Sequence, residues 1–194
     1  SQSFYEPLRT NLKYELNRNQ QNYLENNFDL PPGFLNQLGK DDVRNTEIIK
    51  RIQKENEENK RILFFASSVE QSIFINSMLQ YLNIKSAHID GSTGRDQRSK
   101  IIEDFKSGEI NIVCNYGVLS TGFDAPKTDV IFIARPTASI VLYSQMIGRG
   151  LRGPAIGGTP NCKIIDVIDN IVGFEDQSSI YEHFSGYYSL SELM

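Results

Sequence analysis

The sequence is short of the side chains on which metal centres and disulfide frameworks depend. It has two histidines, His88 and His183, and two cysteines, Cys114 and Cys162, among 194 residues. Each cysteine lies in a short apolar run typical of a buried strand, where packing as a reduced thiol is the ordinary role. We therefore predict no metal site, and we expect His88, at the end of an apolar run, to be packed or hydrogen-bonded.

An excess of positive charge and long apolar runs are also absent. The formal net charge is −4, which excludes a generic polycationic surface, so any contact with nucleic acid must be local and must use amides and hydroxyls as well as charge. No apolar run approaches the length of a membrane span, and no charged-then-apolar leader opens the sequence. These features predict a cytoplasmic protein with no membrane partner. Because the sequence starts at Ser1 without a methionine, we expect it to be a piece of a longer protein.

The chain divides into regions that differ in composition and hydrophobic pattern. Residues 1–60 are polar and rich in asparagine, with a turn-forming LPPG at 30–33, and they lead into a charged helical pattern at 43–61. In that helix the side chains on one side are apolar, namely Ile48, Ile49 and Ile52. From residue 61 onward, short apolar runs alternate with helical patterns. The runs are 62–66, 86–90, 111–115, 130–134 and 163–168, and the helices are 69–82, 95–106 and 139–152.

Nearly continuous hydrophobicity in such runs is typical of strands buried on both faces of a parallel sheet. The alternation therefore predicts an α/β fold in which a doubly wound parallel sheet carries helices on both faces over 61–170. Residues 1–60 are expected to form a helical connecting segment in front of this domain. The aromatic-rich tail, 171–194, is expected to pack back as a helix or to begin a further domain.

One stretch matches the glycine pattern of a dinucleotide-binding turn. Residues 148–153 read GRGLRG, but a dinucleotide turn follows a strand directly and opens a helix. Here the preceding strand ends about a dozen residues earlier. The residues between the strand and the motif already look helical, with Thr137 or Ser139 as the N-cap. Two prolines follow the motif, so no helix can open there. A nicotinamide- or nucleotide-sugar-binding enzyme is therefore the less favoured of the alternatives.

The same stretch is better described as a helix with two faces. At helical spacing, one face carries polar groups and the other carries packing groups. The polar face has Gln145, Arg149 and Arg152, and the packing face has Tyr143, Met146, Ile147 and Leu151. A glycine inside a helix costs about 1 kcal/mol relative to alanine, so each glycine needs a compensating reason. Gly148 borders the arginine face, where a nucleotide or another backbone can approach, and Gly150 lies on the packing side.

A second candidate loop, STGFDAP at 120–126, follows the run at 111–115. The carboxyl end of a strand is where α/β sheets place ligand sites. The hydroxyls of Ser120 and Thr121 suit phosphate binding, and Asp124 suits a sugar hydroxyl or a water. A plain turn fits the loop equally well.

Taken together, these stretches resemble the second motor lobe of superfamily-two helicases and translocases, a RecA-like domain, over about 61–170. ILFFASS (62–68) is similar to motif four, STGFDAP (120–126) to motif five and QMIGRGLR (145–152) to motif six. The region at 87–105 is similar to motif four-a. The sequence at 135–153, RPTASIVLYSQMIGRGLRG, is most similar to that of restriction-enzyme motor subunits and related DNA-repair helicases.

The resemblance implies a role for each matched position. Arg149 and Arg152 would be arginine fingers supported by Gln145, and ATP would lie near Gly122, Asp124 and Gly148. The resemblance favours DNA, single-stranded or duplex, as the nucleic acid. Its backbone would be contacted by Ser67, Ser68, Ser120 and Thr121. An arginine delivered from a second lobe is worth on the order of a thousandfold in the rate of phosphoryl transfer.

The parts that hold ATP and Mg²⁺ in such motors are missing from the sequence. The nearest match to a phosphate-binding loop is GFLNQLGKDD at 33–42, and it departs from the pattern twice. It has one residue too many between the two glycines, and Asp41 follows the lysine where a hydroxyl residue is required. No Asp-Glu pair follows an apolar strand. We therefore expect a first lobe, which holds Mg²⁺, as a partner in the same longer chain, and we expect this piece alone to be nearly inactive as an ATPase. A non-catalytic nucleic-acid or protein binding module with a degenerate motor fold is the alternative. Asp166, Asp169 and Asn170 are expected either to line the cleft between lobes or to cap the next element.

Overall fold

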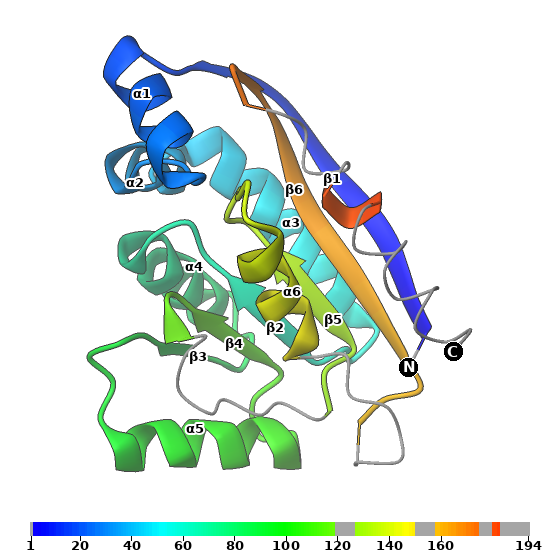
Figure 1. Ribbon diagram of the computed structural model, residues 1–194. Coiled ribbons are helices and arrows are strands. Elements are labelled where there is room, and N and C mark those ends of the chain that lie inside the picture. The colour runs from blue at the N-terminus through cyan, green and yellow to red at the C-terminus, as the bar shows by residue number, and fades with distance from the viewer. Residues whose placement is uncertain (1, 119–126, 150–157, 175–179, 183–194) are drawn as a thin grey trace.

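The strands form one parallel sheet in the computed structural model, which describes residues 2–118, 127–149, 158–174 and 180–182 (Figure 1). The strand order is β1-β6-β5-β2-β4-β3, and every neighbouring pair is parallel. The strands are β1 Gln2–Glu15, β2 Ile62–Phe65, β3 Ser86–Ile89, β4 Ile112–Asn115, β5 Val130–Ile133 and β6 Asn161–Val172. The five strands predicted from the apolar runs are confirmed.

Helices occupy the stretches that the sequence predicts at 43–61, 69–82, 95–106 and 139–152, and two further helices precede them. They are α1 Arg18–Asn27, α2 Pro32–Gly39, α3 Asp42–Glu57, α4 Val69–Tyr81, α5 Arg95–Ser107 and α6 Ile140–Gly148. Polar side chains cap α1, α3, α4 and α6, because the first N–H groups of a helix have no partner within it. The hydroxyl of Ser139, for example, accepts the backbone N–H of Leu142 at 3.2 Å, which confirms Ser139 as the N-cap of α6.

Side chains that alternate along the strands build a core on each face of the sheet. Leu63 and Phe65 of β2 pack with α5 and α6, whereas Ile62 and Phe64 pack with α3 and α4. Ile48 and Ile52 of α3 are fully buried on that second face, as predicted. Full burial of one such side chain contributes about 1.5–3 kcal/mol. The RecA-like arrangement with helices on both faces is therefore confirmed (Figure 1).

Residues 2–15 differ from the predicted helical segment. Gln2–Glu15 is an edge strand that pairs with β6, for example Tyr5 with Ile164 and Leu8 with Val167. The strand is half exposed and polar, so its own hydrophobic pattern is weak, and backbone pairing with β6 decides its conformation. The same pairing explains why β6 extends well beyond the predicted 163–168. Helices do occupy most of 18–57, and in the tail Tyr181 stacks on Tyr5 with ring centroids 4.1 Å apart.

Residues 33–42, the near match to a phosphate-binding loop, do not form a loop of that kind. Most of the stretch belongs to α2, and Gly39 is the last residue of this helix. An interpretation of Gly39 and Lys40 as a loop is therefore wrong for Gly39. The side chain of Asp41 caps α3 by accepting the backbone N–H of Arg44 at 3.0 Å. A third apolar cluster holds α2 against the end of the sheet, through Leu16, Leu30, Phe34, Leu35, Leu38 and Ile171.

Candidate functional site

Helix α6 presents the two faces that the sequence predicts. Tyr143, Met146 and Ile147 are buried, whereas Gln145 is exposed. Arg149 is half-buried at the C-cap position. A Cβ atom added to Gly148 would meet no atom of the described residues within 4 Å, so none of these residues fills the space beside it. Arg152 lies outside the described residues, and so do Ser120, Thr121, Gly122 and Asp124. Their roles, and those of Gln145, Gly148 and Arg149, stay predictions.

A buried hydrogen bond fixes α6 to the sheet. The hydroxyl of Tyr143 donates to Asp166 of β6 at 2.6 Å, and both side chains are fully buried. Burial and the adjacent Asp166 carboxylate raise the pKa of Tyr143 above its usual range, so the phenol stays protonated. Asp166 therefore anchors the helix, which differs from the predicted place at a cleft or a cap.

A cavity of about 250 Å³ opens beside α6 at the carboxyl edge of the sheet. It lies where β2, β4 and β5 end, which is the edge at which open α/β sheets bind ligands. Its walls are mostly apolar and include polar side chains from α6, from the turn after β5 and from the end of β4. The lining includes Phe65, Tyr116, Arg135, Leu142, Gln145 and Met146.

Ser67 and Ser68 follow β2 at the same edge but turn their hydroxyls inward. Ser67 is fully buried and donates to the carbonyl oxygen of Ala134 at 2.7 Å. Ser68 is 5% exposed, and its hydroxyl caps α4 by accepting the backbone N–H of Gln71 at 3.1 Å. Both hydroxyls thus shape the turn, and contact of this turn with nucleic acid stays a prediction.

Residues of the N-terminal segment also reach this edge, which the sequence did not predict. Asp29 accepts from Arg135 at 2.7 Å and from the hydroxyl of Thr137 at 3.3 Å. Arg44 of α3 is fully buried below the turns. Arg135 was recognisable as a cation directly after a predicted strand. Arg44 was recognisable because it stands one helical turn before Ile48 on the apolar side of its helix.

His88 is hydrogen-bonded on both ring nitrogens, as the sequence predicts. Its Nδ1 lies 2.7 Å from the hydroxyl of Ser72, and its Nε2 lies 3.2 Å from Asp90. The order Ser-His-Asp is that of a hydrolytic triad, but Ser72 is fully buried and no substrate can reach it. Hydrogen bonds from Ser92, followed by His88, lower the pKa of Asp90 to about 2. The three residues therefore brace β3 against α4.

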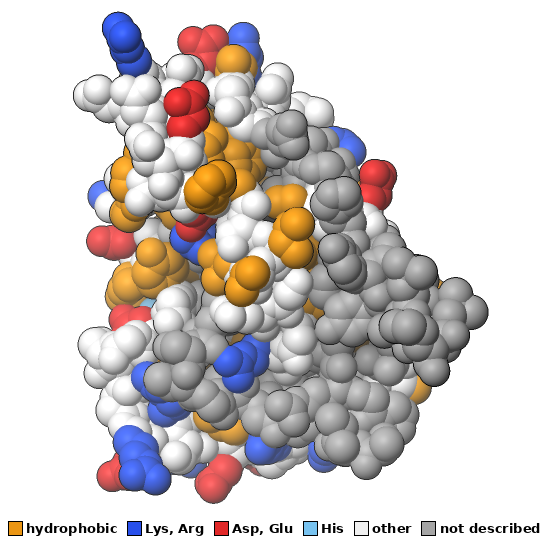
Figure 2. Space-filling model, in the orientation of Figure 1, with side chains coloured by type: hydrophobic (Ala, Val, Ile, Leu, Met, Phe, Trp, Pro, Cys, Tyr) orange, Lys and Arg blue, Asp and Glu red, His pale blue; other side chains and the backbone are white. Residues whose placement is uncertain are grey.

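Over the face seen in Figure 2, the Lys and Arg side chains of the described residues are scattered among neutral and apolar ones. Within the described part of the chain, no cluster of three His, Cys, Asp or Glu side chains is placed to hold a metal ion. None of the helices described is both long enough and apolar enough to cross a bilayer.

Relatives of known name resemble about half of the chain or more. A Lactococcus phage (isolate 7-9) protein called "51.5 kDa protein" is 33% identical over 59% of this chain and 24% of its own length. A putative ATP-dependent helicase of Saccharomyces cerevisiae, IRC3, is 33% identical over 60% of this chain and 16% of its own length. An ATP-dependent RNA helicase of Neurospora crassa, dbp-3, is 30% identical over 53% of this chain and 17% of its own length. The chain thus spans at most about a quarter of these relatives.

Solved structures share the fold at low sequence identity. The C-terminal part of the Fun30 ATPase domain superimposes with a TM-score of 0.56 at 18% identity, over 71% of this chain and 44% of that one. The Pyrococcus furiosus Hef helicase domain superimposes with a TM-score of 0.54 at 22% identity, over 78% of this chain and 30% of that one. The family model described as helicase conserved C-terminal domain matches residues 44–153, more than half of the chain. The anchored helix α6, the ligand edge of the parallel sheet and this match lead to one conclusion: the chain belongs to the helicase conserved C-terminal domain family.

Proposed function

We propose that the chain is the second motor lobe of an ATP-dependent DNA helicase or translocase. The observation that carries the proposal is the geometry of α6 in a member of this family. The helix is fixed to the sheet through Tyr143 and Asp166, and it turns Gln145 outward. None of the described residues fills the space beside Gly148. A rigid helix with an outward polar face is suited to carry arginines toward a ligand held by another lobe.

In this proposal Arg149 and Arg152 reach the γ-phosphate of ATP when the two lobes close. Positive charge aimed at the transferring phosphoryl group stabilises its transition state, and the planar fork of arginine binds phosphate oxygens in pairs. Gln145 supports the arginines, while Gly122, Asp124 and Gly148 lie near the nucleotide. Mg²⁺ and the phosphate-binding loop belong to a first lobe elsewhere in the longer protein, so this chain alone is nearly inactive.

The nucleic acid lies across the carboxyl edge of the sheet. Ser120 and Thr121 contact its phosphates through hydroxyl and amide donors, which suits a chain with no net positive charge. The turn at Ser67 and Ser68 contributes by shaping this edge, because both hydroxyls and the backbone N–H of Ser67 are engaged inside the lobe. The similarity of 135–153 to restriction-enzyme and DNA-repair motors favours DNA, and the working place is the cytoplasm.

The test is Arg152→Ala in the complete protein, with Arg149→Ala beside it. Each variant is expected to lose nucleic-acid-stimulated ATP hydrolysis by on the order of a thousandfold while it stays folded and still binds nucleic acid. Arg18→Ala, at an exposed position on α1, is the matched control and should hydrolyse ATP like the wild type. Assays with duplex DNA, single-stranded DNA and RNA identify the substrate. An unchanged turnover number in Arg152→Ala would contradict the proposal. A wild-type protein that binds nucleic acid without hydrolysing ATP would instead support a non-catalytic module.

A further inference from the structure

Arg44 places a charged group in the interior at the carboxyl edge of the sheet. Its side chain is fully buried, and its Nε donates to Asp169 of β6 at 2.9 Å, where the carboxylate is only 1% exposed. The second oxygen of Asp169 accepts from the hydroxyl of Thr10 at 2.6 Å. A buried charge is tolerated only when it is paired and fully hydrogen-bonded, so this arrangement fixes α3 relative to the last strand.

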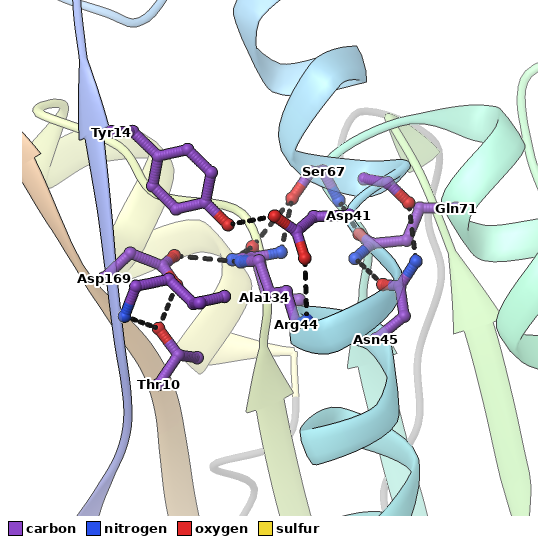
Figure 3. A network of polar contacts seen from close by, with 11 residues as sticks. Thr10, Tyr14, Asp41, Arg44, Asn45, Ser67, Gln71, Ala134 and Asp169 are labelled. Atoms are coloured by element: carbon purple, nitrogen blue, oxygen red, sulfur yellow. Dashed lines mark hydrogen bonds and ion pairs between the residues drawn. The ribbon is translucent and has the colours of Figure 1, made fainter.

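The same guanidinium group reaches two turns at the carboxyl edge of the sheet, across which the nucleic acid is proposed to lie. Its Nη2 donates to the carbonyl oxygen of Ala134, after β5, at 2.6 Å. Its Nη1 lies 3.5 Å from the hydroxyl of Ser67, after β2, which donates to that same carbonyl at 2.7 Å. Figure 3 shows the guanidinium group between the Asp169 side chain and Ser67. One side chain of the N-terminal segment therefore ties both turns together.

A second set of contacts fixes the turn after β2 to the same segment. Asn45 donates to the carbonyl oxygen of Gly39 at 2.8 Å and accepts from the amide of Gln71 at 2.9 Å. The other end of that amide accepts the backbone N–H of Ser67 at 2.6 Å. The approach is close, because a Cβ atom added to Gly39 would lie 2.8 Å from the Ser68 hydroxyl and 2.9 Å from the Cβ of Gln71. The segment and the turn after β2 are therefore packed in direct contact.

We propose that Arg44 is a positioning residue for nucleic-acid binding, an inference that rests on the proposed function. The N-terminal segment sets the place of the turns at Ser67 and Ala134 through this guanidinium group. Asp29 of the same segment holds Arg135, one residue beyond Ala134, at 2.7 Å. Loss of the guanidinium fork therefore weakens the grip on nucleic acid and leaves the phosphoryl-transfer step, which depends on α6, largely intact.

The test compares Arg44→Lys with Arg51→Lys in the complete protein. Both positions lie on α3 and both arginines pair with carboxylates, Arg51 with Glu6 at 2.7 Å and Glu55 at 2.9 Å, but Arg51 contacts neither turn. A lysine at 44 keeps the charge beside Asp169, yet its compact ammonium group cannot also span the Ala134 carbonyl and Ser67. The readout is ATP hydrolysis as a function of the concentration of a duplex DNA fragment, with thermal unfolding measured in parallel.

We expect Arg44→Lys to raise the DNA concentration for half-maximal stimulation about tenfold, the order of one lost charge-assisted hydrogen bond, while the maximal rate falls less than about twofold. Arg51→Lys should leave both values unchanged. A folded Arg44→Lys with the wild-type DNA requirement, or equal shifts in both variants, would overturn the inference alone. If no nucleic acid changes the rate of ATP hydrolysis by the wild-type protein, the proposed function is overturned, and the inference with it. If Arg44→Lys does not fold, Ser67→Ala, which removes one donor to Ala134, must show the shift, and its absence overturns the inference.

Discussion

The hydroxyl of Tyr143 donates to Asp166 at 2.6 Å in the interior and joins helix α6 to strand β6. Tyr143 is fully buried and holds the helix that presents Gln145 and Arg149. A buried carboxylate that loses its donor bears the desolvation cost without the compensating bond. This phenol group thus helps to fix the helix at whose end Arg149 lies.

Tyr143→Phe should lower the free energy of unfolding of this chain by about 1–3 kcal/mol, because it leaves Asp166 short of one donor in the interior. Urea denaturation followed by circular dichroism measures the change. Tyr81→Phe is the matched control, since Tyr81 is 81% exposed and its substitution should stay within about 0.5 kcal/mol of the wild type. Equal stabilities of the two variants would show that the bond contributes nothing.

Asp90 makes the stability of the chain depend on pH in the acid range. Its pKa in the folded state is about 2, against an ordinary value of 3.8, chiefly because Ser92 donates to the carboxylate. Since the folded pKa is the lower one, the charged form stabilises the fold by about 2 kcal/mol above roughly pH 4, and this contribution is lost as the pH falls toward 2. Asp90 is 7% exposed, so solvent screens the interaction little.

Asp90→Asn should therefore be less stable than the wild type near pH 7, and the gap between the two should close as the pH falls from about 5 toward 2. Denaturant unfolding at a series of pH values measures the gap. Glu103→Gln, at an exposed position of α5, should leave the profile of the wild type unchanged. A gap between Asp90→Asn and wild type that stays constant with pH would show that the charge of Asp90 is not the cause.

The two thiols should be protected in the folded chain. Cys114 and Cys162 are fully buried. Burial raises the pKa of Cys162 to about 12 and that of Cys114 beyond its usual range, so neither provides thiolate at neutral pH. A disulfide reagent such as dithionitrobenzoate should react only as fast as the chain opens, and two thiols should react at once in denaturant. Rapid release of a thiol equivalent from the folded chain would contradict this.

The sequence predicted the sheet and its helices because local chemistry specifies them. The run at 130–134 is apolar throughout, and such a run is stable only when it is covered on both faces. Ser139 before an apolar helical pattern marks the start of α6 because a hydroxyl there satisfies a free N–H group. The two faces of α6 were predictable for the same reason, since Gln145 and Tyr143 differ in their affinity for water.

What the sequence by itself determined is thus the set of strands and helices from residue 61 onward, the packing side of α6 and the family resemblance. Tertiary structure alone decided that Gln2–Glu15 is a strand, because an edge strand draws its backbone hydrogen bonds from a partner more than 150 residues away. It alone decided that Ser67 faces inward, that Asp166 anchors α6 and that Arg44 reaches Ala134. Each of these side chains found a polar partner remote in the sequence, and a buried polar group must do so.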